Sequence, residues 1–218
     1  SQDGEMKFHD ADYKGRNHAT VLGGFVKNAL LYASDCEMKL DAVAVSIGPG
    51  SYTGLRIGLS EAKGLCFGLD VPLIGVNTLK LLSVAVMFSR HVEPEEYFVP
   101  MIDARRMEVF TAVYDLALNE ILPNQALVVD ENSFSDLLKE RRLLFLGNGA
   151  DKVAEVIAHP NAEFVRGIRP NAVDMIALSE KAFREGDFMD LAYSTPNYLK
   201  KFHTTTPKKN VLAQMTRK

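Results

Sequence analysis

The strongest chemical signal in this sequence is the glycine-rich loop Gly48-Pro49-Gly50-Ser51-Tyr52-Thr53-Gly54. An apolar run leads into the loop and a helical pattern leads out, and backbone N–H groups at such a helix start can hold an anion. The spacing departs from G-x-x-x-x-G-K-[ST] and from G-x-G-x-x-G, because no lysine follows and Thr53 replaces the last glycine. It is not a G-x-S-x-G nucleophile elbow either, since Pro49 and Thr53 flank Ser51.

Two interpretations of this loop stay open. It is a tight strand-to-helix turn capped by Ser51 or Thr53. Alternatively, it is an anion or nucleotide loop made of Gly48, Gly50, Ser51 and Thr53.

The helix predicted over residues 53–68 has two faces of small residues. One face carries Gly54, Gly58 and Ala62, and the other carries Ser60, Gly64 and Gly68. Glycine inside a helix costs roughly 0.5–1 kcal/mol relative to alanine, whereas small residues four apart let another helix approach closely. One face can pack on the protein's own sheet. We expect the other to meet a second helix, either residues 17–32 or one from another chain.

Charged residues gather at two further places. Asp103, Arg105 and Arg106 share one turn, which is either a solvated hairpin with a local ion pair or an arginine pair directed at a phosphate or a partner carboxylate. The stretch Leu199–Lys218 has six basic residues and no acidic one. A solvated tail is the default interpretation, and a local contact with RNA or protein is the alternative.

Histidine and cysteine spacing predicts no metal or nucleophile site. A helical metal pair needs histidines at i and i+4, but Leu22 stands four residues after His18. Cys36 and Cys66 form no C-x-x-C pair, which argues against a zinc knuckle or a disulfide framework and favours a reduced, cytoplasmic setting. We expect Cys66 to be a small buried hydrophobe. No catalytic residue is predicted.

The elements that position these residues alternate between strand and helix, which favours an α/β fold with a partly parallel sheet. The first half is predicted to contain helices over 17–32, 53–68 and 78–88 and strands over 42–47 and 71–76. The second is predicted to open with a hairpin of strands 97–102 and 107–114. A strand at 143–146 and helices at 150–158 and 171–184 follow, the last capped by Asn171.

Domain organisation follows from the charged, proline-containing segment 89–96. We expect one half over 1–91 and another over 92–218, with a basic tail from about residue 199. Asp3-Gly4 is a hairpin turn signal, which predicts a weak strand over 5–13 and another strand before Ser1. We therefore expect additional N-terminal residues in the working protein. With that strand restored, both halves open with a hairpin, as two copies of one unit would.

Composition narrows the function classes. The 218 residues are 47% hydrophobic and 24% charged, close to the globular average, and the net charge is −3. No overall basic field exists that would hold nucleic acid by phosphate neutralisation alone. Apolar runs such as 84–88 are far shorter than the ~20 residues of a membrane span, so no membrane contact is predicted.

Four segments resemble one known family. Asp41–Gly58 (DAVAVSIGPGSYTGLRIG) and Val71–Leu79 (VPLIGVNTL) are similar to signatures of TsaB, also called YeaZ, in the Kae1/TsaD/YeaZ family. Asp103–Phe110 (DARRMEVF) and Pro196–Leu199 (PNYL) are weaker matches. The resemblance implies an actin-like ATPase (ASKHA) fold of two RNase H-like halves, whose first strand, carrying a phosphate segment, lies outside these 218 residues.

The resemblance also implies a function. Family members belong to the machinery that places threonylcarbamoyl on adenosine 37 of ANN-decoding tRNAs, and they lack the metal site of the catalytic subunit TsaD. The implied role is a non-catalytic activator that dimerises with TsaD, or with itself when alone, through its first two helices. A TsaE-like ATPase is a further expected partner, and a tRNA contact through the complex is left open. No tightly bound cofactor is expected, although ATP or ADP at a subunit interface stays open.

The interface residues expected on these two helices are His18, Leu22, Phe25, Arg56, Ile57, Gly58, Leu59 and Ala62. A stand-alone actin-like ATPase or sugar-kinase-like enzyme is the alternative function. It would need a metal-binding carboxylate and a base facing the cleft, and the sequence displays neither. A glycoprotease is disfavoured because no Ser/His/Asp order or zinc spacing supports it.

Overall fold

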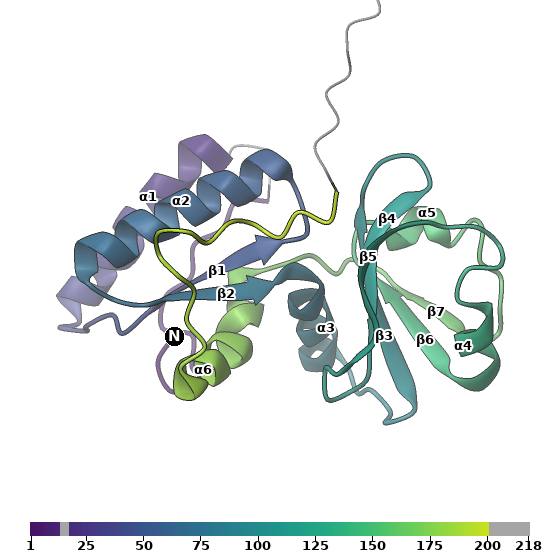
Figure 1. Ribbon diagram of the computed structural model, residues 1–218. Helices are drawn as coiled ribbons and strands as arrows, with labels where there is room; N and C mark the ends of the chain where they lie inside the picture. Colours follow the sequence, from purple (N-terminus) through teal and green to yellow (C-terminus); the bar gives the residue numbers. More distant parts are fainter. Residues whose placement is uncertain (14–17, 201–218) are drawn as a thin grey trace, which may run out of the picture.

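The computed structural model describes residues 1–13 and 18–200, and it has two lobes built on separate sheets (Figure 1). In the first lobe, β1 (Val43–Gly48) pairs in parallel with β2 (Leu73–Asn77). The connection between them is α2 (Tyr52–Leu69). Helix α1 (His18–Asp35) precedes β1 and contacts α2. These four elements confirm the strands and helices predicted for this part of the chain.

The second lobe has a five-stranded sheet in the order β5-β4-β3-β6-β7. Its strands are β3 (Glu96–Asp103), β4 (Glu108–Tyr114), β5 (Glu120–Val128), β6 (Arg142–Leu146) and β7 (Ala162–Val165). The β3–β4 pair is the predicted hairpin, and β6 lies parallel to both β3 and β7. The short helices α4 (Ser135–Glu140) and α5 (Ala150–Val153) precede and follow β6.

Each lobe contains a pair of neighbouring parallel strands, β1–β2 in the first lobe and β6–β7 in the second. In the second lobe, β3 occupies the free edge of that pair. Among the described residues, no strand occupies the corresponding edge of β1. The two-unit architecture predicted from element order is thus visible in the second lobe and in part in the first. The strand expected before Ser1 stays a prediction.

Helix α3 (Thr78–Ser89) lies between the lobes, and most of its residues are buried. Leu79, Leu82 and Val86 pack on the second sheet with Phe98 and Leu144. Its start is capped by Asn77, whose Oδ1 accepts hydrogen bonds from the backbone N–H groups of Leu79 and Lys80. A helix apolar on all sides is stable only where it is covered on all sides, so α3 holds the lobes together.

The C-terminal part of the chain returns to the first lobe. The 3-10 helix η1 (Ala172–Met175) and α6 (Ile176–Glu185) cover the face of the β1–β2 sheet opposite α2, around Ile74 and Val76. Residues 187–198 then cross α2 as an extended strap (Figure 1). The boundary predicted between residues 91 and 92 follows chain order. Packing crosses this boundary, because α3 lies before it and packs on the second sheet, whereas α6 lies after it and packs on the first.

Three sequence predictions need correction. Residues 5–13 form no strand, because they pair with no described strand, although the Asp3-Gly4 turn is present with a bridge between Gln2 and Glu5. The helix predicted over 150–158 ends at Val153, and a turn follows in which the Val156 N–H bonds to the Val153 carbonyl three residues back.

The helix predicted over 171–184 is split into η1 and α6, and the Asn171 side chain does not cap it. Its amide instead exchanges hydrogen bonds with the Tyr13 hydroxyl at 3.2 and 3.3 Å. Strands β5 and β7 and helix α4 were not predicted. No helix in the described part of the chain is long and apolar enough to cross a membrane.

One prediction concerns the tight turn after β6. Gly147 has φ +91, and a Cβ there would lie 2.4 Å from the Met101 carbonyl oxygen, whereas Gly167, with φ +79, faces open space. Both glycines adopt left-handed backbone, so only the close approach differs. We expect Gly147→Ala to lower the free energy of unfolding by about 2–4 kcal/mol, and Gly167→Ala by about 1 kcal/mol. Urea unfolding measures both, and equal losses would contradict this account.

Candidate functional site

Helix α2 presents three different faces to its surroundings. Leu59, Ala62 and Cys66 point to the sheet and are at most 4% exposed, packed with Val43 and Val45 of β1. A second side lies under the strap, and the remaining side faces outward. The predicted role of Cys66 is confirmed: the thiol is fully buried, and burial raises its pKa.

The strap is fastened to α2 and β1 by specific contacts. The Lys63 ammonium donates to the backbone oxygens of Ala192 and Ser194 at 3.2 and 2.8 Å. The Tyr198 ring packs against that of Tyr52, with ring centroids 5.1 Å apart. Asn197 N–H donates to the Ile47 carbonyl at 2.7 Å. The strap therefore covers one flank of α2 and leaves the opposite flank and the outside unaffected.

The outward side, which we call the outer face of α2, consists of Arg56, Ser60, Gly64 and Phe67. All four are exposed, and their spacing of four, four and three residues puts them on one side of a helix. Phe67 is 84% exposed, and a Cβ added at Gly64 would meet no atom within 4 Å. An exposed phenylalanine beside a glycine on a helix is an arrangement that a second helix can cover.

The predicted interface residues differ in how exposed they are. Leu22, Phe25, Ile57 and Gly58 are half-buried, and Arg56 is exposed. His18 begins α1, but its side chain lies outside the described part of the structure.

Two predicted interface residues need correction, because Leu59 and Ala62, each 4% exposed, belong to the core beneath α2. Gly58 also turns toward the sheet, since a Cβ there would lie 3.7 Å from Val45 Cγ2. Of the two small-residue faces, the one with Gly58 and Ala62 therefore packs on the sheet, and the one with Ser60 and Gly64 is open. Sequence analysis missed Phe67, whose exposure depends on which side of α2 meets the sheet.

The glycine-rich loop closes tightly around the end of β1. Gly48 has φ +106, and a Cβ there would lie 2.9 Å from Leu55 Cδ1 and 3.1 Å from the Asn197 oxygen. Ser51 is the N-cap of α2, and its side chain accepts a hydrogen bond from Gly54 N at 3.3 Å. The turn-and-cap interpretation is thus confirmed. An anion or nucleotide at Gly48, Gly50, Ser51 and Thr53 stays a prediction.

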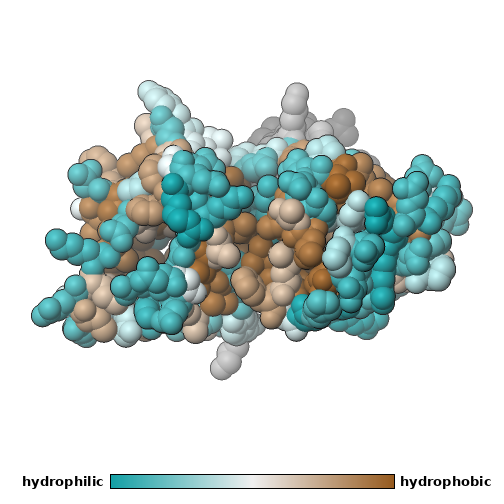
Figure 2. Space-filling view, turned by 90° about the horizontal axis from the view of Figure 1, so that it is seen from below, coloured by the Kyte–Doolittle hydropathy of each residue, from teal (hydrophilic) through white to brown (hydrophobic). Residues whose placement is uncertain are grey.

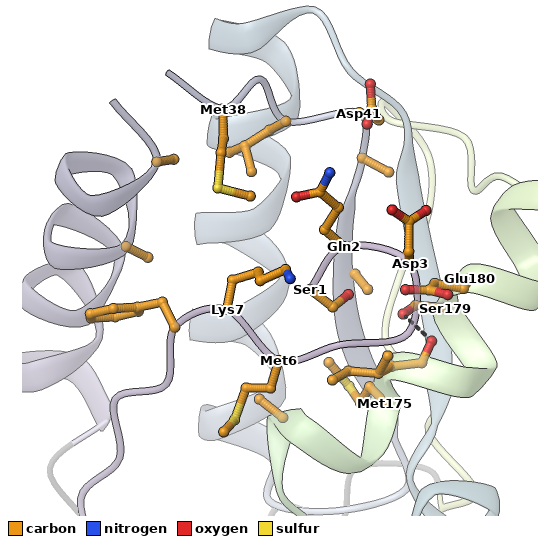
Figure 3. Close-up of a pocket in the computed structure, with 18 of the residues that line it drawn as sticks. Ser1, Gln2, Asp3, Met6, Lys7, Met38, Asp41, Met175, Ser179 and Glu180 are labelled. Atoms are coloured by element: carbon orange, nitrogen blue, oxygen red, sulfur yellow. Dashed lines mark hydrogen bonds between the residues drawn. The ribbon is translucent and has the colours of Figure 1, made fainter. Parts of the chain in front are cut away.

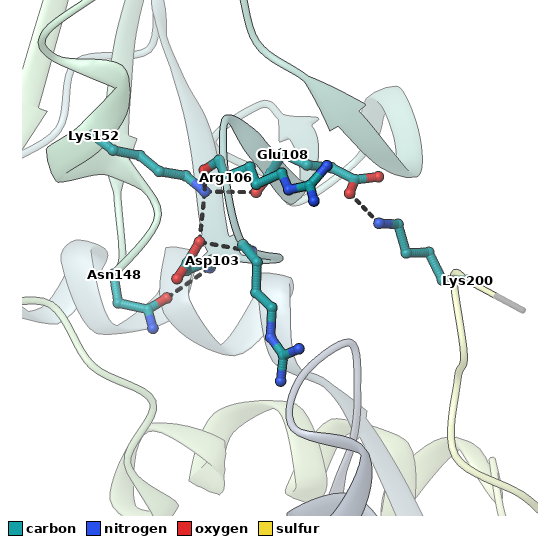
Figure 4. Close-up of polar contacts among 7 residues, drawn as sticks. Asp103, Arg106, Glu108, Asn148, Lys152 and Lys200 are labelled. Carbon is teal, nitrogen blue, oxygen red and sulfur yellow. Dashed lines mark hydrogen bonds and ion pairs between the residues drawn. The ribbon is translucent and has the colours of Figure 1, made fainter. Parts of the chain in front are cut away.

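The tip of the β3–β4 hairpin is held by Lys152 of α5 (Figure 4). The Lys152 ammonium contacts Asp103 Oδ1 at 2.5 Å, the Arg106 oxygen at 2.6 Å and the Glu108 oxygen at 2.7 Å. Hydrogen bonding to Lys152 lowers the pKa of Asp103. Asp103 therefore pairs with Lys152 rather than with an arginine of its own turn, a partner 49 residues away that no local pattern indicates.

An apolar groove of about 960 Å³ lies beside β1, between α1 and α6. Met6, Met38 and Met175 surround it (Figure 3). The N-terminal turn forms one wall and is attached to α6 by Gly4 N–H, which donates to Glu180 Oε1 at 2.7 Å. Figure 2 shows the surface hollowed on this side, with hydrophobic atoms around the hollow. The groove follows the edge of β1 that carries no described strand.

Residues 1–13 and 18–200 contain no group of three or more His, Cys, Asp and Glu side chains that could hold a metal ion. Leu22 stands on α1 where a helical metal pair would need a second histidine after His18. Three surfaces of the described residues stand out as candidates for binding: the outer face of α2, the tip of the β3–β4 hairpin with Arg105 and Arg106, and the groove beside β1.

Comparison with known proteins finds a matching family model, related sequences and similar solved structures. A family model described as TsaD, tRNA N6-adenosine threonylcarbamoyltransferase, matches residues 11–215. The chain is 35% identical over 144 residues to the tRNA threonylcarbamoyladenosine biosynthesis protein TsaB of Bacillus subtilis, covering 62% of this chain. It spans only 58% of the length of that relative.

Two further similarities cover more of the chain. The Escherichia coli protein of the same description is 26% identical over 193 residues, which are 85% of this chain and 81% of that protein. A solved Pseudomonas aeruginosa structure, described as an uncharacterized protein with similarity to peptidase YEAZ, aligns with a TM-score of 0.72 and 25% identity over 85% of each chain.

The Lys152 contact generates a testable prediction. Replacing the lysine in Lys152→Met removes the hydrogen bond that favours the ionised form of Asp103, so the pKa of Asp103 should rise toward 3.8. Carboxyl-carbon NMR titration of both proteins measures this. Asp136, whose pKa is lowered by Lys139 within the same helix α4, is the internal control and should titrate identically in both proteins. An unchanged Asp103 titration would contradict the assignment.

Proposed function

The chain belongs to the Kae1/TsaD/YeaZ family, and we propose that it is a non-catalytic subunit that activates threonylcarbamoyl transfer to adenosine 37 of ANN-decoding tRNAs. In this proposal it docks on a TsaD-like catalytic subunit through α1 and the outer face of α2. The relatives' names support the reaction. The observation that carries the docking is the open row of Arg56, Ser60, Gly64 and Phe67.

The outer face has the composition of a helix-docking surface. Covering an exposed phenylalanine such as Phe67 contributes about 1.5–3 kcal/mol. Arginine is among the residues enriched at binding hot spots, and Arg56 is held with its guanidinium 4.7 Å from the centre of the Tyr52 ring. Gly64 lets the backbone of a crossing helix come close. A large side chain, Phe67, next to the open space at Gly64 is complementary to a helix that also has a large residue beside a small one.

A partner from the same family is the natural occupant. A TsaD-like subunit shares the fold and so carries an equivalent pair of helices, which makes pairing of like with like geometrically straightforward. In the same way, we propose that two copies of the chain pair through this surface in a twofold arrangement when the chain is alone. Helix α1 adds Leu31, which is 53% exposed, and Gly23 and Gly24, which face open space.

The proposal has three further parts: the chain is not catalytic, it works with further partners, and it has a defined cellular location. Leu22, in place of a second metal-binding histidine, supports an activating role over a catalytic one. A TsaE-like ATPase joins the complex, and any ATP or ADP binds at a subunit interface. We propose a cytoplasmic location, which the unpaired Cys36 and Cys66 support.

The experiment that tests the proposal is a reconstitution. A TsaD-like subunit, a TsaE-like ATPase, the carbamoyl-adenylate synthase and unmodified tRNA are incubated with threonine, bicarbonate and ATP, with and without this chain. We expect modified nucleoside, detected by mass spectrometry, only when the chain is present. Absence of product while the chain and the TsaD-like subunit co-elute would contradict the function.

Variants at one glycine test the docking surface in the same assay. Gly64→Leu should prevent co-elution and lower product formation by roughly tenfold or more, because its side chain blocks helix approach. Gly64→Ala is the matched control. It should stabilise α2 by about 1 kcal/mol and retain product and complex. If Gly64→Leu forms the complex like wild type, the outer face of α2 is not the docking surface.

A further inference from the structure

Arg105 and Arg106 occupy the tip of the β3–β4 hairpin and have no role in the docking described above. Both are exposed, and both adopt left-handed backbone, with φ of 75° and 51°. Two consecutive non-glycine residues in this region are uncommon and cost energy. The surrounding contacts must therefore hold the tip in this shape.

Those contacts are made by Lys152, Asp103 and Asn148 (Figure 4). Lys152 binds two backbone oxygens and one carboxylate oxygen of the hairpin, as described above. The Asp103 N–H donates to Asn148 Oδ1 at 3.0 Å, and the Arg105 N–H donates to Asp103 Oδ1 at 2.9 Å. The hairpin backbone is thus preorganised, while the two guanidinium groups are not used in holding it.

The charges around the tip do not cancel. Its two carboxylates are each engaged by a lysine, Asp103 by Lys152 and Glu108 by Lys200. Within residues 1–13 and 18–200, neither Arg105 nor Arg106 has an ion pair. The two guanidinium groups therefore remain as net positive charge on a rigid turn, which is the setting in which arginine binds phosphate.

The ion pair of Lys200 with Glu108 also places the end of the described chain beside this tip. The sequence from Lys200 onward has six basic residues and no acidic one, so the basic segment of the chain starts where the arginine pair lies. Two neighbouring guanidinium groups beside the first residue of a basic sequence segment match a ligand with repeated negative charges, and a single carboxylate on a partner protein would not require them.

We propose that Arg105 and Arg106 bind the phosphodiester backbone of RNA, with Lys152 as the residue that positions them. The choice of RNA rests on the proposed function, whose substrate is a tRNA. Contacts to phosphate carry no sequence information, so this site adds affinity and orients the RNA without selecting a sequence. The net charge of −3 is compatible with such a site, because the patch acts locally.

The test is direct binding of the full chain to a fluorescein-labelled tRNA transcript, followed by fluorescence anisotropy over a series of KCl concentrations. For the double variant Arg105→Ala/Arg106→Ala, we expect affinity at low salt to fall on the order of tenfold or more. The slope of log K against log salt should decrease by about 1–2. Arg166→Ala/Arg169→Ala is the matched control, since it removes the same charge from two exposed arginines after β7 and should bind like wild type.

Competition identifies the ligand. Unlabelled RNA should displace the probe, and a length-matched single-stranded DNA that competes better would reassign the site to DNA and overturn the proposal. Equal losses in both double variants would show general charge attraction and also overturn it. So would unchanged RNA binding in the tip variant together with lost co-elution with the TsaD-like subunit, which would indicate a protein contact.

Binding is read without any modification reaction, so the two proposals fail separately. A chain that binds tRNA through the tip but supports no threonylcarbamoyl transfer would contradict only the proposed function. Normal transfer by a chain with no measurable tRNA affinity would contradict only this inference.

Discussion

The fold of the first lobe depends on one constraint: a helix that crosses a two-stranded parallel sheet can bury only one of its sides against that sheet. In α2 that side is Leu59, Ala62 and Cys66, and their packing on β1 and β2 fixes the rotation of the helix about its axis. Arg56 and Phe67 must then point outward. The docking surface is thus a consequence of how the core is packed, and a substitution that rotates α2 would remove it.

The lobes are joined by exchange of helices rather than by a linker alone. Helix α3, which follows the first sheet in the chain, packs on the second sheet, and α6, which follows the second sheet, packs on the first. The strap then runs from α6 across α2 and ends beside the β3–β4 hairpin tip, where Lys200 pairs with Glu108. The same C-terminal segment thereby links the outer surface of one lobe to the basic tip of the other.

Local sequence patterns were sufficient for the elements with strong periodicity and clear ends. The apolar run before Gly48, the Ser51 cap and the helix after it were all predicted, because each depends on neighbouring residues. Patterns failed where distant residues decide. Residues 5–13 have strand-like composition but no adjacent strand. Asn171 bonds to Tyr13 instead of capping a helix, and Lys152 reaches a hairpin 49 residues away.

The site was predicted at the level of elements more than of residues. The first two helices could be chosen from small-residue spacing and from the family resemblance. Which small face is open depends on contact with Val45, and a single sequence does not contain that information. For this reason the sequence predicts Leu59 and Ala62 at the interface although they are buried in the core, and it does not identify Phe67, which is exposed.

Oxidative footprinting of Phe67 tests the central claim most directly. Phe67 is 84% exposed, and Phe88, 72% exposed at the end of α3, is the internal reference. The chain is exposed to hydroxyl radicals first alone, at a dilution at which light scattering shows a monomer, and then in complex with a TsaD-like subunit. Modification of both rings is measured by mass spectrometry. We expect modification of Phe67 to fall severalfold in the complex while Phe88 is unchanged. Undiminished modification of Phe67 in a fully formed complex would show that the partner docks elsewhere.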